Sequence, residues 1–276
     1  MRAICSATIA EVVAKLCIDA NLYADDFVKS GITKSAESGK SAINALDSML
    51  QNIAISAEEK MPMCQDTGMV VVYVEIGQEV YVEGNLADAI NEGVRRGYRD
   101  GYFRASVIKS PLDRVNTDDN TPAVIHYNII AGDGFKITVV PKGFGSENKS
   151  ALVMLPPSAG LKGVEDFVLA TVKKAGPDAC PPLIVGIGLG GTMEKAAMMS
   201  KEALLLFGET AEDEQIRNLE ADLLEKINLL GIGPAGLKGQ TTALGVKILT
   251  YPTHIAGMPV AVNLCCHVLR HKSAYL

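Results

Sequence analysis

The pattern of apolar and polar positions predicts a chain that begins with helices and continues with alternating strands and helices. In the first sixty residues, apolar side chains recur at helical spacing, as at Ile9, Val13 and Leu16. Further helices are predicted over residues 41–55, 85–99 and 193–207, with another ending near residue 230. Runs of β-branched and apolar residues predict strands near residues 70, 125, 137, 185, 247 and 260.

This order of elements indicates a mixed α/β, or α+β, fold: a helical N-terminal region of about residues 1–60, followed by a mixed sheet with flanking helices. We expect one domain that spans residues 1–276. Within it, Gly132-Asp133-Gly134 separates the predicted strands 123–130 and 135–140, which is a signal for a β-hairpin.

A glycine-rich run at residues 186–191 fits the Gly-x-Gly-x-x-Gly pattern of dinucleotide-binding folds. Such folds also need a second parallel strand that ends in an acidic residue about 20 positions later. Here an acidic segment, residues 209–214, leads into another helix instead. The pattern therefore disfavours a nucleotide site and leaves the start of the following helix as a candidate site for a carboxylate.

Composition and charge narrow the function classes. With 276 residues, 48% of them hydrophobic, the chain can bury a sizeable core. The net charge of −6 argues against binding to nucleic acid or to an anionic membrane surface. No secretion signal and no apolar run of about 20 residues is present. We therefore expect a cytoplasmic protein whose six cysteines are thiols or metal ligands.

Three cysteines occupy loop positions where metal binding competes with simple packing. Cys64 opens a polar run before a buried strand, where a plain turn with one buried thiol is an equally good interpretation. Cys180 precedes two prolines, which predict an extended and rigid backbone. Cys266 follows Cys265, and because neighbouring side chains of a strand diverge, only one of the two is expected to reach a common centre.

The scatter of these cysteines argues against two common uses. Zinc sites usually contain Cys-x-x-Cys pairs, and disulfide frameworks belong to short secreted chains. Cys17 lies on an apolar helical stripe, so we expect a buried packing residue there, and we expect the same of Cys5. The isolated loop cysteines therefore raise the question of an iron–sulfur cluster with one iron left open.

Two other segments contain candidate chemistry. Residues 142–149 follow a strand, and their glycines allow backbone amides to converge on an anion, with Lys149 adding charge. A purely structural turn is the alternative. His254 lies between Pro252 and Gly257, so we expect it in a loop, where hydrogen bonding is its ordinary role.

In combination these motifs resemble the class I, iron–sulfur fumarases. The resemblance is carried by residues 64–68, 142–149, 180–182 and 190–192, and by His254, which lies twelve residues before Cys266. It extends from near the N-terminus to the last residues, and the chain is similar to the α subunit of the two-chain form, shared with L-tartrate dehydratases. One departure is at residues 236–240, where many relatives have a Gly-Gly-Lys-type run, so the role of Lys238 stays open.

This resemblance implies a [4Fe–4S] cluster bound by Cys64, Cys180 and Cys266, with one iron that no protein group ligates. It also implies substrate contacts and catalytic roles for a second group of residues. Those implied to bind substrate are Gln65, Asp66, Arg104 and Gly145. Asp66 is further implied in proton transfer, and His254 in catalysis near the cluster.

The implied reaction is the reversible hydration of fumarate to (S)-malate, a step of the tricarboxylic acid cycle, with dehydration of L-tartrate as the alternative. The implied partners are a small dicarboxylate substrate and a β subunit that carries a smaller mobile domain and the catalytic hydroxyl, in a heterotetramer. An alternative of another class is a non-catalytic binding or regulatory protein that has lost the cluster.

Overall fold

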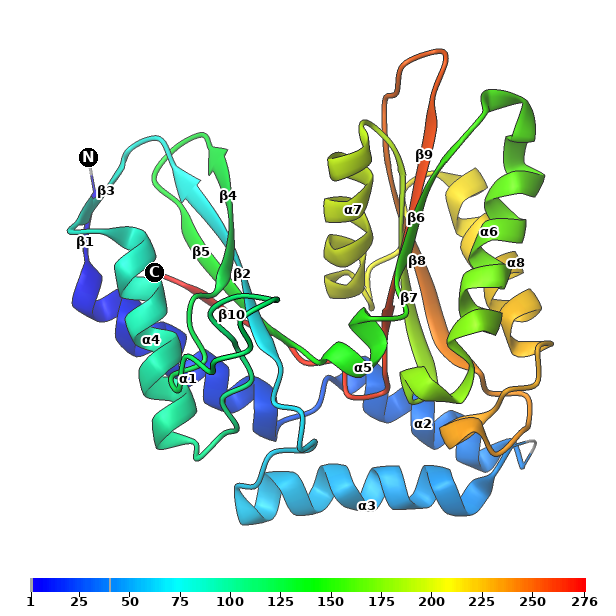
Figure 1. The fold of residues 1–276 in the computed structure, drawn as a ribbon, viewed down its shortest axis with the longest axis horizontal. Coiled ribbons are helices and arrows are strands. Elements are labelled where there is room, and N and C mark those ends of the chain that lie inside the picture. The colour runs from blue at the N-terminus through cyan, green and yellow to red at the C-terminus, as the bar shows by residue number, and fades with distance from the viewer. Residues whose placement is uncertain (1, 40) are drawn as a thin grey trace. The chain divides into compact units, whose positions relative to one another are not determined.

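The fold is described from a computed structural model, for residues 2–39 and 41–276. Helices and mixed sheets alternate along the chain, which confirms the predicted fold class (Figure 1). The chain divides into two compact units. Unit 1 comprises Met1–Asp25, Ile53–Phe144 and Arg270–Leu276, and unit 2 comprises Asp26–Asn52 and Gly145–Leu269. That both units act as one functional domain over residues 1–276 stays a prediction.

Unit 1 contains a four-stranded sheet of order β10-β5-β2-β4 and a small parallel pair, β1-β3. The strands of the larger sheet are β2 (Met69–Gly77), β4 (Val124–Ile130), β5 (Phe135–Lys142) and β10 (Lys272–Tyr275). The small pair is β1 (Arg2–Cys5) with β3 (Val80–Glu83). Helices α1 (Ser6–Leu22) and α4 (Leu86–Asp100) pack against each other and form a common apolar core with β2 and β5.

The close approach of α1 and α4 depends on glycine. A Cβ atom added at Gly93 would lie 2.6 Å from the carbonyl oxygen of Ala10. Cys17 of α1 is fully buried, as predicted, and this burial raises the pKa of its thiol. The prediction for Cys5 is wrong, because Cys5 is exposed while its neighbour Ile4 is buried. Alternate side chains of β1 point to opposite faces, and Ile4 takes the inner one.

The predicted hairpin at residues 132–134 is also wrong. Strands β4 and β5 do not pair with each other, because β2 lies between them, parallel to β4 and antiparallel to β5. The connection crosses the end of β2, where the Gly77 amide donates to the carbonyl oxygen of Gly134 at 2.8 Å. A Cβ atom at Gly77 would lie 2.2 Å from the carbonyl oxygen of Gly132. The glycines therefore serve a tight crossing rather than a hairpin turn.

Unit 2 is built on a four-stranded sheet of order β6-β9-β7-β8. Its strands are β6 (Ala151–Leu155), β7 (Leu183–Gly190), β8 (Ala243–Tyr251) and β9 (Met258–Cys265). Its helices are α2 (Asp26–Glu37), α5 (Phe144–Glu147), α6 (Gly160–Ala175), α7 (Met193–Glu202) and α8 (Glu214–Asn228), with α3 (Ile43–Glu59) passing from unit 2 into unit 1. Helices α6 and α8 share one apolar core with β7, β8 and β9 (Figure 1).

The glycine-rich run lies inside β7, and its cause is packing. A Cβ atom at Gly186 would lie 2.1 Å from the carbonyl oxygen of Ser200, and one at Gly188 would lie 2.0 Å from that of Ala196. The missing side chains therefore let α7 lie directly on the strand. Alternate residues of β7, such as Ile187, are buried in the core shared with α6 and α8.

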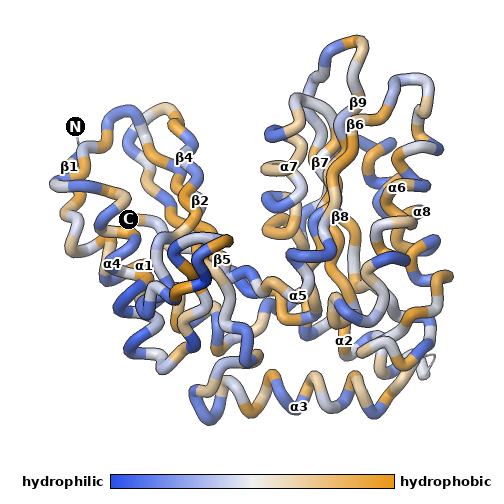
Figure 2. Tube along the Cα trace, in the orientation of Figure 1, coloured by the Kyte–Doolittle hydropathy of each residue, from blue (hydrophilic) through white to orange (hydrophobic). Residues whose placement is uncertain are grey.

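All six strands predicted from the sequence are present, whereas β1, β3, β6, β10 and α6 were not predicted. Figure 2 shows the strands as largely hydrophobic, while α3 alternates between hydrophobic and hydrophilic residues. Within residues 2–39 and 41–276, no helix combines the length and apolar character needed to cross a membrane.

Candidate functional site

The Cys64 loop, residues 64–68, precedes β2 in unit 1 and is held through its backbone. The Tyr98 hydroxyl donates to the carbonyl oxygen of Thr67 at 2.6 Å and lies 3.1 Å from that of Gly68. Burial raises the pKa of Tyr98, so the hydroxyl keeps the proton that it donates. The hydroxyl of Thr67 in turn donates to the carbonyl oxygen of Arg104 at 2.9 Å. Buried partners thus determine the conformation of this loop.

The carboxylate of Asp66 is oriented by two backbone amides. Its Oδ1 accepts from the amide of Gly68 at 3.0 Å, and its Oδ2 accepts from the amide of Phe144 at 2.8 Å. Phe144 begins α5 and belongs to the predicted anion nest at residues 142–149, so one amide of that segment binds this carboxylate. Cys64 and Asp66 are half-buried, and Gln65 is exposed. The backbone is therefore fixed while the side chains of residues 64–66 reach solvent.

Arg104 is brought to the Cys64 loop by its main chain. Its carbonyl oxygen binds Thr67, as described above, whereas its side chain is exposed and free of the core. Unit 1 therefore gathers four of the predicted residues: Cys64, Gln65, Asp66 and Arg104.

Cys180 and Cys266 lie at the same end of the sheet in unit 2. Strands β7 and β9 are antiparallel, with Ile184 opposite Cys265. Cys180 precedes β7 and Cys266 follows β9, so both cysteines occupy the same edge. The Nδ1 atom of His267 lies 3.3 Å from the carbonyl oxygen of Cys180. Cys265 is buried in the strand, whereas Cys266 is half-exposed, which favours Cys266 as the ligand of the two.

Cys180 does not have the extended backbone that we predicted. Its φ of 55° and ψ of 62° place it in the left-handed region, where it ends a short 3₁₀ helix, Gly176–Ala179. Its amide donates to the carbonyl oxygen of Pro177 at 3.0 Å, and this turn outweighs the preference of a residue before proline. A left-handed conformation costs a non-glycine residue roughly 1 kcal/mol, and such strain concentrates at functional sites.

A glycine-containing turn at residues 235–236, to which the sequence analysis gave no role, packs against the Cys180 turn. The amide of Ala235 donates to the carbonyl oxygen of Pro181 at 2.8 Å. Gly236 packs so closely that an added Cβ atom would lie 2.4 Å from the Cβ of Pro177. The exposed thiol of Cys180 thus projects from a backbone that is held on both sides.

Gly145 belongs to a segment of unit 2 that contacts the Cys180 turn. A Cβ atom at Gly145 would lie 3.9 Å from the carbonyl oxygen of Asp178, and the Nζ of Lys149 donates to the Asp178 carboxylate at 2.8 Å. The hydroxyl of Ser150 accepts from the amide of Leu264 near the end of β9 at 3.1 Å. The segment 145–150 therefore connects the surroundings of both cysteines.

His254 lies elsewhere in unit 2. It is exposed in the loop that connects β8 to β9, which are not neighbours in the sheet, and β9 separates it from Cys266 in the chain. At about 3.3 Å per residue, the strand puts roughly 20 Å or more between them. A role for His254 near the cluster stays a prediction.

The three candidate ligands have the donor atoms and the solvent exposure that an iron–sulfur cluster requires. Clusters are bound by thiolates, and Cys64, Cys180 and Cys266 each place an accessible thiol on a constrained loop. Cys64 belongs to unit 1, and the other two belong to unit 2. Within the described parts of the chain, no three His, Cys, Asp or Glu residues form a group that could hold a metal ion.

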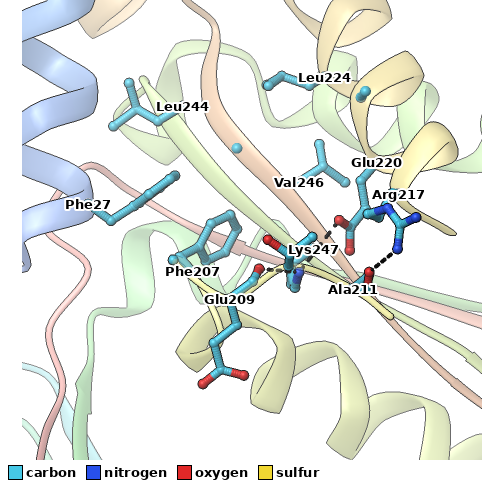
Figure 3. Close-up of a pocket in the computed structure, with 14 residues that line it drawn as sticks. Phe27, Phe207, Glu209, Ala211, Arg217, Glu220, Leu224, Leu244, Val246 and Lys247 are labelled. Atoms are coloured by element: carbon cyan, nitrogen blue, oxygen red, sulfur yellow. Dashed lines mark hydrogen bonds and ion pairs between the residues drawn. The ribbon is translucent and has the colours of Figure 1, made fainter. Parts of the chain in front are cut away.

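A cavity of about 340 Å³ in unit 2 contains none of the predicted residues (Figure 3). Apolar side chains such as Phe27 and Phe207 line it, together with the buried Lys247. The Nζ of Lys247 donates to the carbonyl oxygen of Glu209 at 2.7 Å and lies 3.6 Å from the carboxylate of Glu220. Since the buried charge has partners within the protein, we do not assign this cavity as the site.

Comparison with known proteins finds similarity over most of the chain. A family model described as "Fumarate hydratase (Fumerase)" matches residues 10–275. A Methanocaldococcus jannaschii protein, whose name proposes the alpha subunit of an L(+)-tartrate dehydratase, is 39% identical over 268 residues, which cover 94% of each chain. The L(+)-tartrate dehydratase subunit alpha of Escherichia coli K12 is 31% identical over 238 residues, covering 84% of this chain and 78% of that protein.

Proposed function

Because the chain belongs to the fumarate hydratase (Fumerase) family, we propose that it is the cluster-carrying α subunit of a two-chain hydro-lyase. The proposed reaction is the reversible addition of water to fumarate, which gives (S)-malate. The observation that carries the proposal is the grouping of predicted residues: Asp66, Gln65 and Arg104 around Cys64 in unit 1, and Gly145 near Cys180 and Cys266 in unit 2.

In this proposal Cys64, Cys180 and Cys266 hold a [4Fe–4S] cluster with one iron that lacks a protein ligand. When bound, the cluster supplies a Lewis acid for the poor hydroxide leaving group. The chain contributes thiols on loops whose backbones are already fixed by buried hydrogen bonds. The chain passes from unit 1 to unit 2 immediately after Phe144 and returns to unit 1 at Arg270.

Asp66 is proposed to move the proton at the carbon next to a substrate carboxylate. Its two amide contacts orient the carboxylate, so little reorganisation is needed when substrate binds. The exposed side chains of Gln65 and Arg104 are proposed to bind substrate oxygens, with the Gly145 amide contributing a neutral donor. His254 has the weakest support, because β9 separates it from Cys266 within unit 2.

We propose a β subunit as the partner, since the named relatives are alpha subunits. It would carry the smaller mobile domain and the catalytic hydroxyl, in a heterotetramer. The proposed setting is the cytoplasm. L(+)-tartrate is a second candidate substrate, favoured by the names of both relatives. Turnover of fumarate, (S)-malate and L(+)-tartrate by the assembled enzyme separates the two candidates.

The cluster is tested by anaerobic reconstitution of the chain, followed by iron and acid-labile sulfide counts and an absorption spectrum. The chain should bind about four irons, and Cys180→Ser should lose most of them because one thiolate is missing. Cys5→Ser is the matched control, because that thiol is also exposed but lies in β1. A wild-type chain without iron would favour the non-catalytic alternative, and a Cys180→Ser variant with the normal cluster would remove Cys180 from the ligand set.

A further inference from the structure

We propose that Arg270 is a positioning residue that, together with Asn21, clamps both ends of the segment containing Cys64 and Gln65. This inference deepens the proposed function and rests on it for its catalytic meaning. All of the residues concerned belong to unit 1.

The clamp consists of two hydrogen bonds to the loop and one that joins the clamping residues. The Nη2 of Arg270 donates to the carbonyl oxygen of Asp66 at 2.8 Å. The amide of Met63 donates to the carbonyl oxygen of Asn21 at 3.1 Å. The Nη1 of Arg270 donates to Oδ1 of Asn21 at 3.0 Å, so the two attachments form one connected unit. Cys64 lies between the attached residues Met63 and Asp66.

Asn21 can act as a rigid anchor because α1 holds it. It is fully buried near the end of that helix, and its Nδ2 donates to the carbonyl oxygen of Cys17 at 2.9 Å. This bond leaves Oδ1 directed at the guanidinium of Arg270. The loop is therefore attached to a packed helix rather than to another loop.

The burial of Arg270 indicates that its guanidinium serves the Cys64 loop rather than solvent. Arg270 is only 2% exposed, and its Nε has no hydrogen-bond partner among the described residues. Its guanidinium donates to two neutral oxygens, the carbonyl of Asp66 and Oδ1 of Asn21, and burying a charge is expensive unless nearby groups compensate it. A Cβ atom added at Gly143 would lie 3.4 Å from Nη2 of Arg270 and 3.2 Å from Oδ2 of Asp66. The positive charge thus lies near the carboxylate that we assign to proton transfer.

The clamp is tested first on the chain without its cluster, where catalysis plays no part. We would measure hydrogen exchange in a peptide covering residues 61–68 and the rate at which iodoacetamide alkylates Cys64. Arg270→Gln should raise both by about 10-fold or more, because it removes a charged hydrogen bond to the loop. Arg270→Lys should recover part of the protection, since an ammonium group retains the charge but lacks the planar fork of guanidinium.

Thr138→Val is the matched control, because Thr138 is also buried in unit 1 and its hydroxyl lies 2.8 Å from that of Ser273 in β10. It should leave the exchange of residues 61–68 unchanged. If Arg270→Gln does not fold, Asn21→Ala tests the same clamp. As a single substitution it should raise the exchange rate of residues 61–68 several-fold. In the double variant with Arg270→Lys, it should raise that rate little beyond the rate of Arg270→Lys alone.

Two outcomes separate the clamp from the proposed function. Exchange and alkylation at wild-type rates in folded Arg270→Gln or Asn21→Ala would overturn the clamp, whether or not the chain binds iron. A wild-type chain that binds no iron would overturn the proposed cofactor while leaving the exchange result valid. If both ideas hold, the reconstituted Arg270→Gln variant should also lose iron in air faster than the wild-type chain and Thr138→Val.

Discussion

At the scale of single residues, the polar groups of the candidate site are oriented by main-chain atoms. Asp66 is held by the amides of Gly68 and Phe144, and its own carbonyl oxygen is bound by Arg270. Main-chain donors keep their positions more firmly than long exposed side chains, which lose rotamer entropy when they are ordered. This arrangement suits a carboxylate whose direction must be set before substrate arrives.

The proton-transfer role of Asp66 predicts a selective loss of rate. Asp66→Asn should lower kcat by about 10²-fold to 10⁴-fold, because an amide cannot exchange the proton, while the iron content stays near that of the wild type. Asp133→Asn, on an exposed turn of the same unit, should keep the full rate. Steady-state kinetics of both assembled enzymes provide the measurement. Normal kcat in Asp66→Asn would assign the proton to another group.

The lowered pKa of the buried His271 predicts that the stability of the folded chain depends on pH. Burial lowers its pKa, the nearby charge of Asp25 acts in the opposite direction, and Lys272 and Lys136 add to the lowering. Because the folded pKa lies below the unfolded value, the unfolded chain binds the proton first as pH falls. Stability is therefore present above the ordinary histidine pKa and decreases as the pH falls toward the lower folded value.

The measurement is the thermal midpoint of the chain between about pH 7.5 and pH 5.5, which spans the ordinary titration of histidine. The wild-type midpoint should fall over this range, and His271→Gln should fall less because the titrating group is gone. Equal slopes for the two proteins would show that other groups control the acid sensitivity. His126→Gln is a control for a histidine stacked on Tyr73 in the same unit.

At the scale of elements, glycines determine how closely helices and strands approach. In unit 2, β7 carries glycines on the face that meets α7 and branched apolar residues on the other. In unit 1, Gly93 and Gly97 do the same between α4 and α1. A pattern that suggests ligand binding in sequence thus has a packing cause in the fold.

Gly188→Ala should destabilise unit 2 by about 2 kcal/mol or more, because the added methyl group would meet the carbonyl oxygen of Ala196 at 2.0 Å. Gly257→Ala should change stability by less than about 0.5 kcal/mol, since its nearest atom would be 3.9 Å away. Urea unfolding of both variants measures the difference. Equal stability of the two would mean that α7 can move away from β7 without loss.

At the scale of the whole molecule, the proposed ligands and substrate contacts are divided between two units that the chain enters and leaves several times. The named relatives are subunits of larger enzymes, which agrees with a site that this chain does not complete alone. Cluster binding and full turnover should therefore be separable properties.

The reconstituted chain alone should bind iron but turn over fumarate at a small fraction of the rate that it shows after a β subunit is added. The physical reason is that the catalytic hydroxyl and further cations are proposed to come from that subunit. Rates before and after mixing, with light scattering for the assembly size, provide the test. Full turnover by the isolated chain would contradict the division of the site.

The sequence by itself predicted most of the longer elements, and its resemblance to a known family supplied the candidate ligands. Six strands followed from runs of branched apolar residues, because burial on a sheet imposes that composition locally. The motifs around Cys64, Cys180 and Cys266 indicated the family, which the comparisons confirmed. Short edge elements such as β1, β3 and β10 escaped prediction, because four residues carry too little periodicity.

Only the tertiary structure decided the pairings and the supporting contacts. The order β10-β5-β2-β4, the left-handed backbone of Cys180 and the exposure of Cys5 all differ from the local expectation. Arg270 and Asn21 reach the Cys64 loop from opposite ends of the chain, 249 positions apart. A local sequence pattern indicates which residues favour burial or a turn. It does not indicate which distant groups will form hydrogen bonds with those residues, because these partners depend on the packing of the whole chain.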